Sequence, residues 1–259
     1  MCHSTSSVLV TTIPHVYGTL LTDSAWTLNM RFRPFIWPDN LPHNLICKCS
    51  RKITITHLLN CKHFITFRSR VHNAVRDQLY CMCKSYRIEF FLEPLLSNLF
   101  HDDDDDFHKN NRGDVILPGL DGTFILVDVK SVDPCNVSNE RLANSEIHNP
   151  LSNAENLKIK KYNELLYKLS TQKHAKYNLY PFVFFLFGSL APTAIRFLED
   201  FEMIVKRKTN RNFNRIFWQN RIVFFAFKGM LKMVSDAMLS LGSHYQRVTS
   251  SCFVLGEIY

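Results

Sequence analysis

The stretch DVILPGLDGTFILVDVK, from Asp114 to Lys130, gives the clearest structural signal in the chain. Two apolar runs flank a turn at Pro118–Gly122, and an Asp-Gly pair between apolar runs is a strong signal for a β-hairpin. We therefore predict two adjacent strands, Asp114–Leu117 and Thr123–Lys130.

The predicted hairpin gathers groups that can do chemistry. Side chains two residues apart on a strand share a face about 6.6 Å apart, so Asp128 and Lys130 should lie together, with Asp114 beside them. Two carboxylates can hold one hard cation such as Mg²⁺ or Mn²⁺, and Lys130 can orient a water or stabilise an anionic transition state. Exposed cross-strand charges are the alternative, but the apolar run that precedes Asp128 predicts burial, where an unpaired carboxylate is costly.

Outside the hairpin, the pattern alternates between helices and strands. Apolar residues recur at helical spacing from Val71 to Met82. The segment Arg87–Leu96 is rich in Ile and Phe, which predicts a strand buried on both faces and ended by Pro94. Further predictions are a helix over Leu151–Leu169, a strand over Pro181–Phe187, and helices over Ala194–Val205 and Arg215–Leu241. The order indicates a mixed α/β layer fold.

Two acidic features lie next to the predicted hairpin. Glu93 is a third candidate metal ligand at the end of the preceding strand, or simply a charge that terminates it. The run Asp102–Asp106 lies in a polar loop, residues 101–112. It lacks the spaced ligands and the glycine of a calcium loop, so a solvated linker is the better interpretation.

A short cysteine and histidine segment predicts a structural zinc site. Its candidate ligands are Cys47, Cys49, His57 and Cys61, with His63 as an alternative to His57. Such a site would contribute about 10–16 kcal/mol of binding energy to a segment that has no core of its own. Free buried cysteines are the alternative, because the one-residue gap between the first two is tight. Cys81 and Cys83 are interpreted as packing residues.

Composition narrows the class of protein. The chain has 259 residues, is 46% hydrophobic and carries a net charge of +8, which excludes a disordered or collagen-like chain. Basic residues concentrate on both sides of an acidic middle third. This distribution fits either a phosphate-binding surface or an ordinary solvated one.

The sequence shows no export or membrane signal. The N-terminus lacks a basic segment followed by an apolar one. The longest apolar stretch, Tyr177–Leu190, is shorter than the ~20 residues needed to cross a bilayer. We expect an intracellular protein, nuclear or cytoplasmic, that is not secreted and has no membrane partner; reduced thiols or metal ligands are then expected in place of disulfides.

The motifs follow one another in a specific order. They are the segment Trp26–Pro42, the zinc-knuckle pattern, Arg68, Arg70 and His72, then Glu93-Pro94, Gly113-Asp114, Asp128-Val-Lys130 with Asp133-Pro134, Lys158-x-x-Lys161-Tyr162 and the strand Pro181–Gly188. In this succession the chain resembles the restriction-like endonuclease domain at the C-terminus of site-specific non-LTR retrotransposon proteins, a nuclease of the PD-(D/E)XK class.

The resemblance implies a fold and a division of the chain. The expected core is αβββαβ, a mixed sheet flanked by helices, with a small zinc knuckle and a C-terminal helical extension. The implied segments are an N-terminal connector remnant (1–46), the zinc knuckle (47–65), the endonuclease domain (66–205) and a basic helical extension (206–259). Within the last, residues 206–221 would form either a DNA-facing helix or a basic cap.

The resemblance also implies roles for individual residues. Asp114 and Asp128 would bind the catalytic divalent metal, Lys130 would be the catalytic lysine, and Glu93 an auxiliary acid and ligand. Lys158 or Lys161 would line the site, and we name Lys161 as the catalytic candidate; an exposed helix surface is the alternative for both. The knuckle, with three side chains, would grip DNA through its phosphates. These three are Arg68, Arg70 and His72.

The implied activity is hydrolysis of a phosphodiester bond of target DNA, which makes the nick that primes reverse transcription, with element RNA as a further partner. Gly113 replaces the proline of the motif name, Ser50 a glycine after the second cysteine, and His72 is separated from Arg70. No reverse transcriptase palm is recognisable. The alternatives are therefore an inactive zinc-dependent nucleic-acid-binding module and a non-functional fragment of a retroelement.

Overall fold

The computed structural model describes residues 46–47, 49–94, 113–133, 150–173, 176–186 and 189–239. Within them, the strands form one four-stranded mixed sheet in the order β1-β2-β3-β4. The strands are β1 (Phe91–Leu92), β2 (Val115–Pro118), β3 (Phe124–Val132) and β4 (Tyr177–Phe185). The first three pair antiparallel and β4 runs parallel to β3.

The helices flank this sheet. They are α3 (Ile55–Asn60), α4 (Ile65–Ser85), α6 (Pro150–Lys173), α7 (Pro192–Thr209) and α8 (Arg215–Leu239), with the short 3₁₀ helix η1 (Lys62–Phe64) before α4. Among the described residues, the order from α4 to β4 is helix, three strands, helix, strand. This is the order that we predicted, and the α/β class with a mixed sheet between helices is confirmed.

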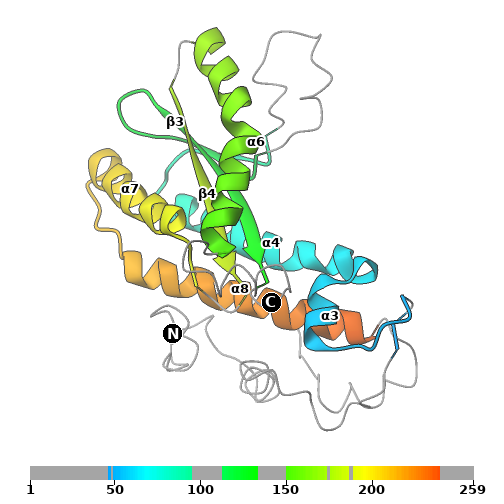
Figure 1. The fold of residues 1–259 in the computed structure, drawn as a ribbon. Helices are drawn as coiled ribbons and strands as arrows, with labels where there is room; N and C mark the ends of the chain where they lie inside the picture. Colours follow the sequence, from blue (N-terminus) through cyan, green and yellow to red (C-terminus); the bar gives the residue numbers. More distant parts are fainter. Residues whose placement is uncertain are drawn as a thin grey trace.

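Alternation along the strands sorts the side chains into two layers. Val127 and its odd-numbered neighbours on β3 join the main core with α4 and α7. Leu126 faces the other way and packs against Tyr162 and Leu165 of α6. The helix α8 lies against α4 on the side away from the sheet (Figure 1). The sheet therefore separates α6 from the other helices.

The predicted hairpin is confirmed. Val115 pairs with Val127 and Pro118 with Phe124, so the register follows the apolar pattern. Asp121 and Gly122 both adopt positive φ, at 55° and 73°, as the turn requires. An aspartate tolerates this conformation and a glycine adopts it without steric cost, which explains the signal in the sequence.

The predicted buried strand over Arg87–Leu96 is wrong. Only Phe91 and Leu92 pair, at the edge of the sheet, and both are exposed. Positive φ at Arg87 and Glu93 turns the chain at each end of the segment. The apolar residues that produced the signal serve different neighbours: Ile88 enters the core and Phe90 packs on Tyr80.

The later elements confirm the sequence pattern. The helices predicted over 151–169, 194–205 and 215–241 correspond to α6, α7 and α8, and the strand predicted over 181–187 corresponds to β4. The connector at 1–45, the acidic loop at 101–112 and the chain after residue 239 lie outside the described residues. No helix in the described part of the chain is both long and apolar enough to span a bilayer.

The contact between α4 and α8 depends on a glycine. A Cβ at Gly229 would meet the Cα of Val71 at 2.9 Å and the backbone oxygen of Arg70 at 3.2 Å. Backbone atoms cannot move aside as a flexible side chain can. This glycine lets the two helices approach closely, and α8 therefore belongs to the same core as the sheet.

We expect Gly229→Ala to destabilise the protein by about 1–3 kcal/mol, because overpacking at this crossing outweighs the gain of up to about 1 kcal/mol in helix propensity. Urea unfolding measures the change. The control is Lys232→Ala, an exposed position on the same helix. A stabilised Gly229→Ala protein would contradict the close crossing.

Candidate active site and metal centre

Four predicted zinc ligands converge in the structure. The ligand atoms of Cys47, Cys49, His57 and Cys61 all lie within 4.8 Å of one another, so the cluster could hold a metal ion such as zinc. The Sγ of Cys61 lies 3.7 Å from that of Cys47 and 3.8 Å from that of Cys49, and the Nε2 of His57 lies 3.5 Å from the Sγ of Cys49.

These separations match the edges of a zinc tetrahedron. Zn–S bonds of about 2.3 Å and Zn–N bonds of about 2.0–2.1 Å at tetrahedral angles place sulfurs about 3.8 Å apart and sulfur and nitrogen about 3.6 Å apart. Local structure sets this spacing. Ser50, at φ 64°, turns the chain after Cys49, and the side chain of Thr54 caps α3 by accepting from the backbone N–H of His57.

The ionisation of the cluster also suits a metal. Burial, and then the charge of Arg51, lowers the pKa of His57, which favours the neutral ring that a metal needs. Burial raises the pKa of Cys47. At Cys49 hydrogen bonds from the Arg51 backbone and neighbouring thiols outweigh burial and lower the pKa. Cys49 therefore ionises more readily than Cys47.

The remaining cysteines and histidine behave differently. His63 is exposed and stands outside the cluster, so the structure selects His57. Cys83 is buried in the main core, where burial raises its pKa to about 12. Cys81 is half-buried and packs against the same core. Both serve as packing residues, as predicted.

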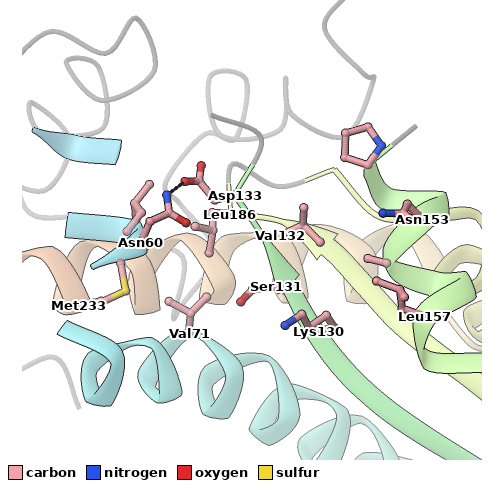
Figure 2. A pocket seen from close by; sticks show the side chains of 13 residues that line it. Asn60, Val71, Lys130, Ser131, Val132, Asp133, Asn153, Leu157, Leu186 and Met233 are labelled. Atoms are coloured by element: carbon pink, nitrogen blue, oxygen red, sulfur yellow. Dashed lines mark hydrogen bonds between the residues drawn. The ribbon is translucent and has the colours of Figure 1, made fainter. Parts of the chain in front are cut away.

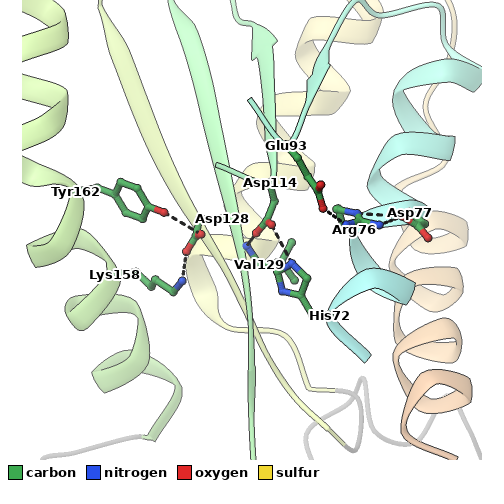
Figure 3. A network of polar contacts seen from close by, with 9 residues as sticks. All are labelled: His72, Arg76, Asp77, Glu93, Asp114, Asp128, Val129, Lys158 and Tyr162. Carbon is green, nitrogen blue, oxygen red and sulfur yellow. Dashed lines mark hydrogen bonds and ion pairs between the residues drawn. The ribbon is translucent and has the colours of Figure 1, made fainter. Parts of the chain in front are cut away.

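Asp114 lies at the end of the antiparallel ladder. Because Val115 pairs with Val127, Asp114 stands level with Asp128 on the neighbouring strand. Its Oδ2 accepts a hydrogen bond of 2.5 Å from the backbone N–H of Val129, and its Oδ1 lies 2.9 Å from the Nε2 of His72 on α4 (Figure 3). The carboxylate is therefore buried but paired.

Asp128 is buried on the opposite, α6 side of β3. Its Oδ1 accepts a hydrogen bond of 3.1 Å from the hydroxyl of Tyr162, and its Oδ2 forms an ion pair with Lys158. This Oδ2 is buried and accepts no hydrogen bond. Burial, then the charge of Asp128 and more weakly that of Asp114, raises the pKa of Tyr162. The charge of Asp128 thus opposes ionisation of the hydroxyl that it contacts.

Glu93 is held at the edge of this network. Its side chain is exposed and forms an ion pair with Arg76, while its backbone N–H donates to the carbonyl of Asp114 over 2.9 Å. Burial lowers the pKa of Arg76, but the hydrogen bond and charge of Asp77 and the charges of Glu93 and Asp114 outweigh it and raise that pKa. Arg76 therefore faces three carboxylates.

The structure brings some predicted residues together and separates others. Asp114 and Asp128 are level, but their side chains turn toward helices on opposite faces of the sheet (Figure 3). Among the described residues, the Cys/His cluster is the one group of three or more such ligand atoms within 4.8 Å, so these two carboxylates and Glu93 do not form another.

The basic side chains have specific neighbours. Lys158 pairs with Asp128, whereas Lys161 is exposed and lies 4.8 Å from the ring centroid of Tyr162. Arg70 pairs with Asp236 of α8 at 2.7 Å. His72, which we predicted to contact DNA, lies 2.9 Å from Asp114. The side chain of Arg68 lies outside the described residues.

Two contacts were not anticipated from the sequence: the Tyr162 bond to Asp128 and the His72 bond to Asp114. The first had a signal, because Tyr162 lies four residues after Lys158 and so on the same face of α6. The second had none, because it depends on how the chain bends just before β2.

A cavity of about 240 Å³ opens beside Lys130 (Figure 2). Ser131, Val132 and Asp133 form its β3 wall, and Asn60 of α3 closes one end by donating to Asp133. Asn153 and Leu157 of α6 line the other side. The catalytic candidate Lys130 therefore stands at the rim of a space that is open to a ligand.

No family model matches the chain, and no curated protein matches its sequence.

We expect Cys61→Ser to abolish stoichiometric zinc binding and to lower the thermal midpoint, because a three-ligand site loses affinity and Cys61 joins the knuckle to the core. Metal analysis and the thiolate-to-cobalt absorption of the Co²⁺ form measure the loss. His63→Ala and Cys81→Ser are the controls and should keep both signals. Normal metal content in Cys61→Ser would contradict the assignment.

Proposed function

We propose that the protein is a metal-dependent DNA endonuclease with a PD-(D/E)XK-type site. One observation carries the proposal: Asp114, which directly precedes β2, stands level with Asp128 on the neighbouring strand β3, with Lys130 two residues further along β3. The helix, three strands, helix and strand around them occur in the order that the resemblance implies.

We propose that Asp114 and Asp128 together would hold a magnesium ion. Mg²⁺ is commonly held by one or two carboxylates, with water and substrate phosphate as its other ligands, so a third protein ligand is not required. The Oδ2 of Asp128 is buried and already pairs with the ammonium of Lys158, so Mg²⁺ would have to displace that ammonium to bind there. Mg²⁺ or Mn²⁺ held by Asp114 and Asp128 would polarise the phosphodiester and lower the pKa of a bound water.

The surrounding residues position these carboxylates. The N–H of Val129 and His72 fix Asp114, and Tyr162 and Lys158 fix Asp128. Lys130 is exposed on the α6 face of β3, where its ammonium orients the attacking water or stabilises the pentavalent anion. Water attacks phosphorus, the bond to the leaving oxygen breaks, and that oxygen takes up a proton.

The biological setting follows from the resemblance. In a site-specific retroelement, such a nuclease nicks chromosomal DNA and the exposed end primes reverse transcription. The zinc knuckle precedes α4 directly in the chain, as it precedes the nuclease in that family. We propose zinc as its structural metal, DNA as the substrate and element RNA as a further partner.

A second function, DNA binding without cleavage, is favoured by one observation. Asp114 and Asp128 are each already held by a basic side chain, His72 and Lys158, on opposite faces of the sheet. If this arrangement persists when Mg²⁺ is present, the carboxylates cannot share an ion. The protein would then be a zinc-dependent binding module.

We expect the native protein to nick supercoiled plasmid DNA with Mg²⁺ or Mn²⁺. Asp114→Asn and Asp128→Asn should each lower the rate by at least about 10²–10³-fold, the scale for loss of a transition-state electrostatic contact. The control is Asp121→Asn, an exposed turn position. Zinc content and thermal unfolding establish that each variant is folded. Undiminished nicking by folded aspartate variants would exclude this site, and binding without nicking by the native protein would favour the second function.

The same nicking assay distinguishes the roles of Lys130 and Lys161. We expect Lys130→Met to lose most activity, because the methionine keeps the side-chain length but removes the charge beside Asp128. Lys161→Met should retain activity, because Lys161 is exposed and its ammonium lies over the ring of Tyr162, whereas Lys158 is the lysine that pairs with Asp128. Equal losses would contradict this difference in roles.

A further inference from the structure

A cluster of cations and aromatic rings lies on α8, away from the carboxylates. The guanidinium of Arg221 lies 5.8 Å from the ring centroid of Trp218 and 5.0 Å from that of Phe225. The ammonium of Lys228 lies 5.6 Å from the centroid of Phe224 and 5.3 Å from that of Phe225. Two positive charges thus share one ring.

Helical spacing produces this arrangement. Arg221, Phe225 and Lys228 are separated by four and three residues, so they form a single stripe along α8. Gln78 of α4, itself buried, accepts a hydrogen bond of 2.7 Å from the Nε of Arg221. The rings and this amide hold both side chains in place. Ordering these cations on binding therefore costs less entropy than ordering two free surface lysines.

The stripe lacks a negative partner. Within the described part of the chain, neither Arg221 nor Lys228 forms an ion pair with a carboxylate, although Arg70, Arg76 and Arg215 all do. Burial, and then the charge of Arg221, lowers the pKa of Lys228. Two cations that repel each other in a half-buried setting are stabilised by any anion that binds both.

We propose that Arg221 and Lys228 form a second DNA contact surface that binds backbone phosphates of duplex DNA. The inference rests on the proposed function for the identity of the substrate, but it assigns a separate site that does no chemistry. Duplex DNA carries one charge per about 1.7 Å along its axis, so two ordered cations on one helix can neutralise neighbouring phosphates without reading bases.

The stripe is also connected to the candidate carboxylates through α4. Arg221 is bonded to α4 through Gln78, and the same helix carries His72 and Arg76 toward Asp114 and Glu93. DNA bound to α8 would therefore have a defined position relative to α4, the helix whose His72 holds Asp114 in place. In this proposal the α8 surface orients the DNA, and the metal site at Asp114 and Asp128 promotes hydrolysis.

The test is the salt dependence of duplex binding by the full chain, measured by fluorescence anisotropy without added Mg²⁺ or Mn²⁺. For Arg221→Gln with Lys228→Gln, we expect the slope of log K against log salt to become shallower by about 0.9 per lost phosphate contact. At 0.1 M salt this corresponds to about 8-fold weaker binding for each contact.

Two controls separate charge from packing. Arg221→Lys with Lys228→Arg keeps both charges and should retain the native slope. Lys176→Gln with Lys84→Gln removes two exposed charges elsewhere and should leave the slope nearly unchanged. Thermal unfolding of each variant shows whether a loss of DNA binding is caused by misfolding. If the Gln variant is misfolded, the binding of the charge-preserving variant decides the outcome.

Three results would overturn the proposal: an unchanged slope in the folded Gln variant, an equal change in the Lys176 and Lys84 control, or a change confined to single-stranded RNA. Plasmid nicking, measured in parallel, separates the two proposals. If the Gln variant has a shallower slope but the native protein never nicks, the α8 surface is supported and the endonuclease is rejected. If the native protein nicks but the slope is unchanged in the Gln variant, the endonuclease is supported and the α8 surface is rejected.

Discussion

The pairing of Val115 with Val127 is the constraint on which the candidate site depends. It places Asp114 level with Asp128, and a slip of one residue would move every side chain of β2 to the other face of the sheet. Apolar residues on both faces specify the register, because Val127 packs with α4 and α7 while Leu126 packs with α6. The chemistry is therefore positioned by hydrophobic burial on both sides of a short hairpin.

Burial of the two carboxylates carries a cost that the structure offsets locally. An isolated buried carboxylate would be neutralised by protonation, whereas hydrogen bonds and opposite charges retain the ionised form. Asp114 obtains these from Val129 and His72, and Asp128 from Tyr162 and Lys158. Each buried carboxylate thus has a hydrogen-bond donor and a basic side chain beside it. The same partners also compete with the cation, so the network sets how strongly an ion must bind.

Much of this could be predicted from sequence where the signal is local. Helical spacing from Val71 to Met82, the Asp-Gly turn and the grouping of Cys47, Cys49, His57 and Cys61 each depend on neighbours in the chain. The apolar composition of Arg87–Leu96 led to a wrong prediction of a buried strand, because its apolar residues pack against different neighbours. Ile88 enters the main core, whereas Phe90 packs on Tyr80.

Contacts between elements that are far apart in the chain could not be predicted from the sequence. His72 reaches Asp114 because α4 crosses the end of β2, and Arg70 reaches Asp236 because α8 lies along α4. Neither crossing can be read from periodicity, which reports that a helix has an apolar face but not what covers it. The close approach at Gly229 was hidden for the same reason, since one glycine in a helix has several possible explanations.

The helix α4 joins all these features, and this would give a metal ion bound by the Cys/His cluster a role beyond local stability. Cys61 is followed directly by η1 and α4, so a metal held by the cluster fixes the start of α4. The same helix presents His72 to Asp114, Gln78 to Arg221 and Val71 to the backbone crossing at Gly229. Because interiors are close-packed, a shift at one end of α4 is transmitted along it. The position of Asp114 and the order of the α8 cations should therefore depend on metal in the knuckle, although neither contacts it.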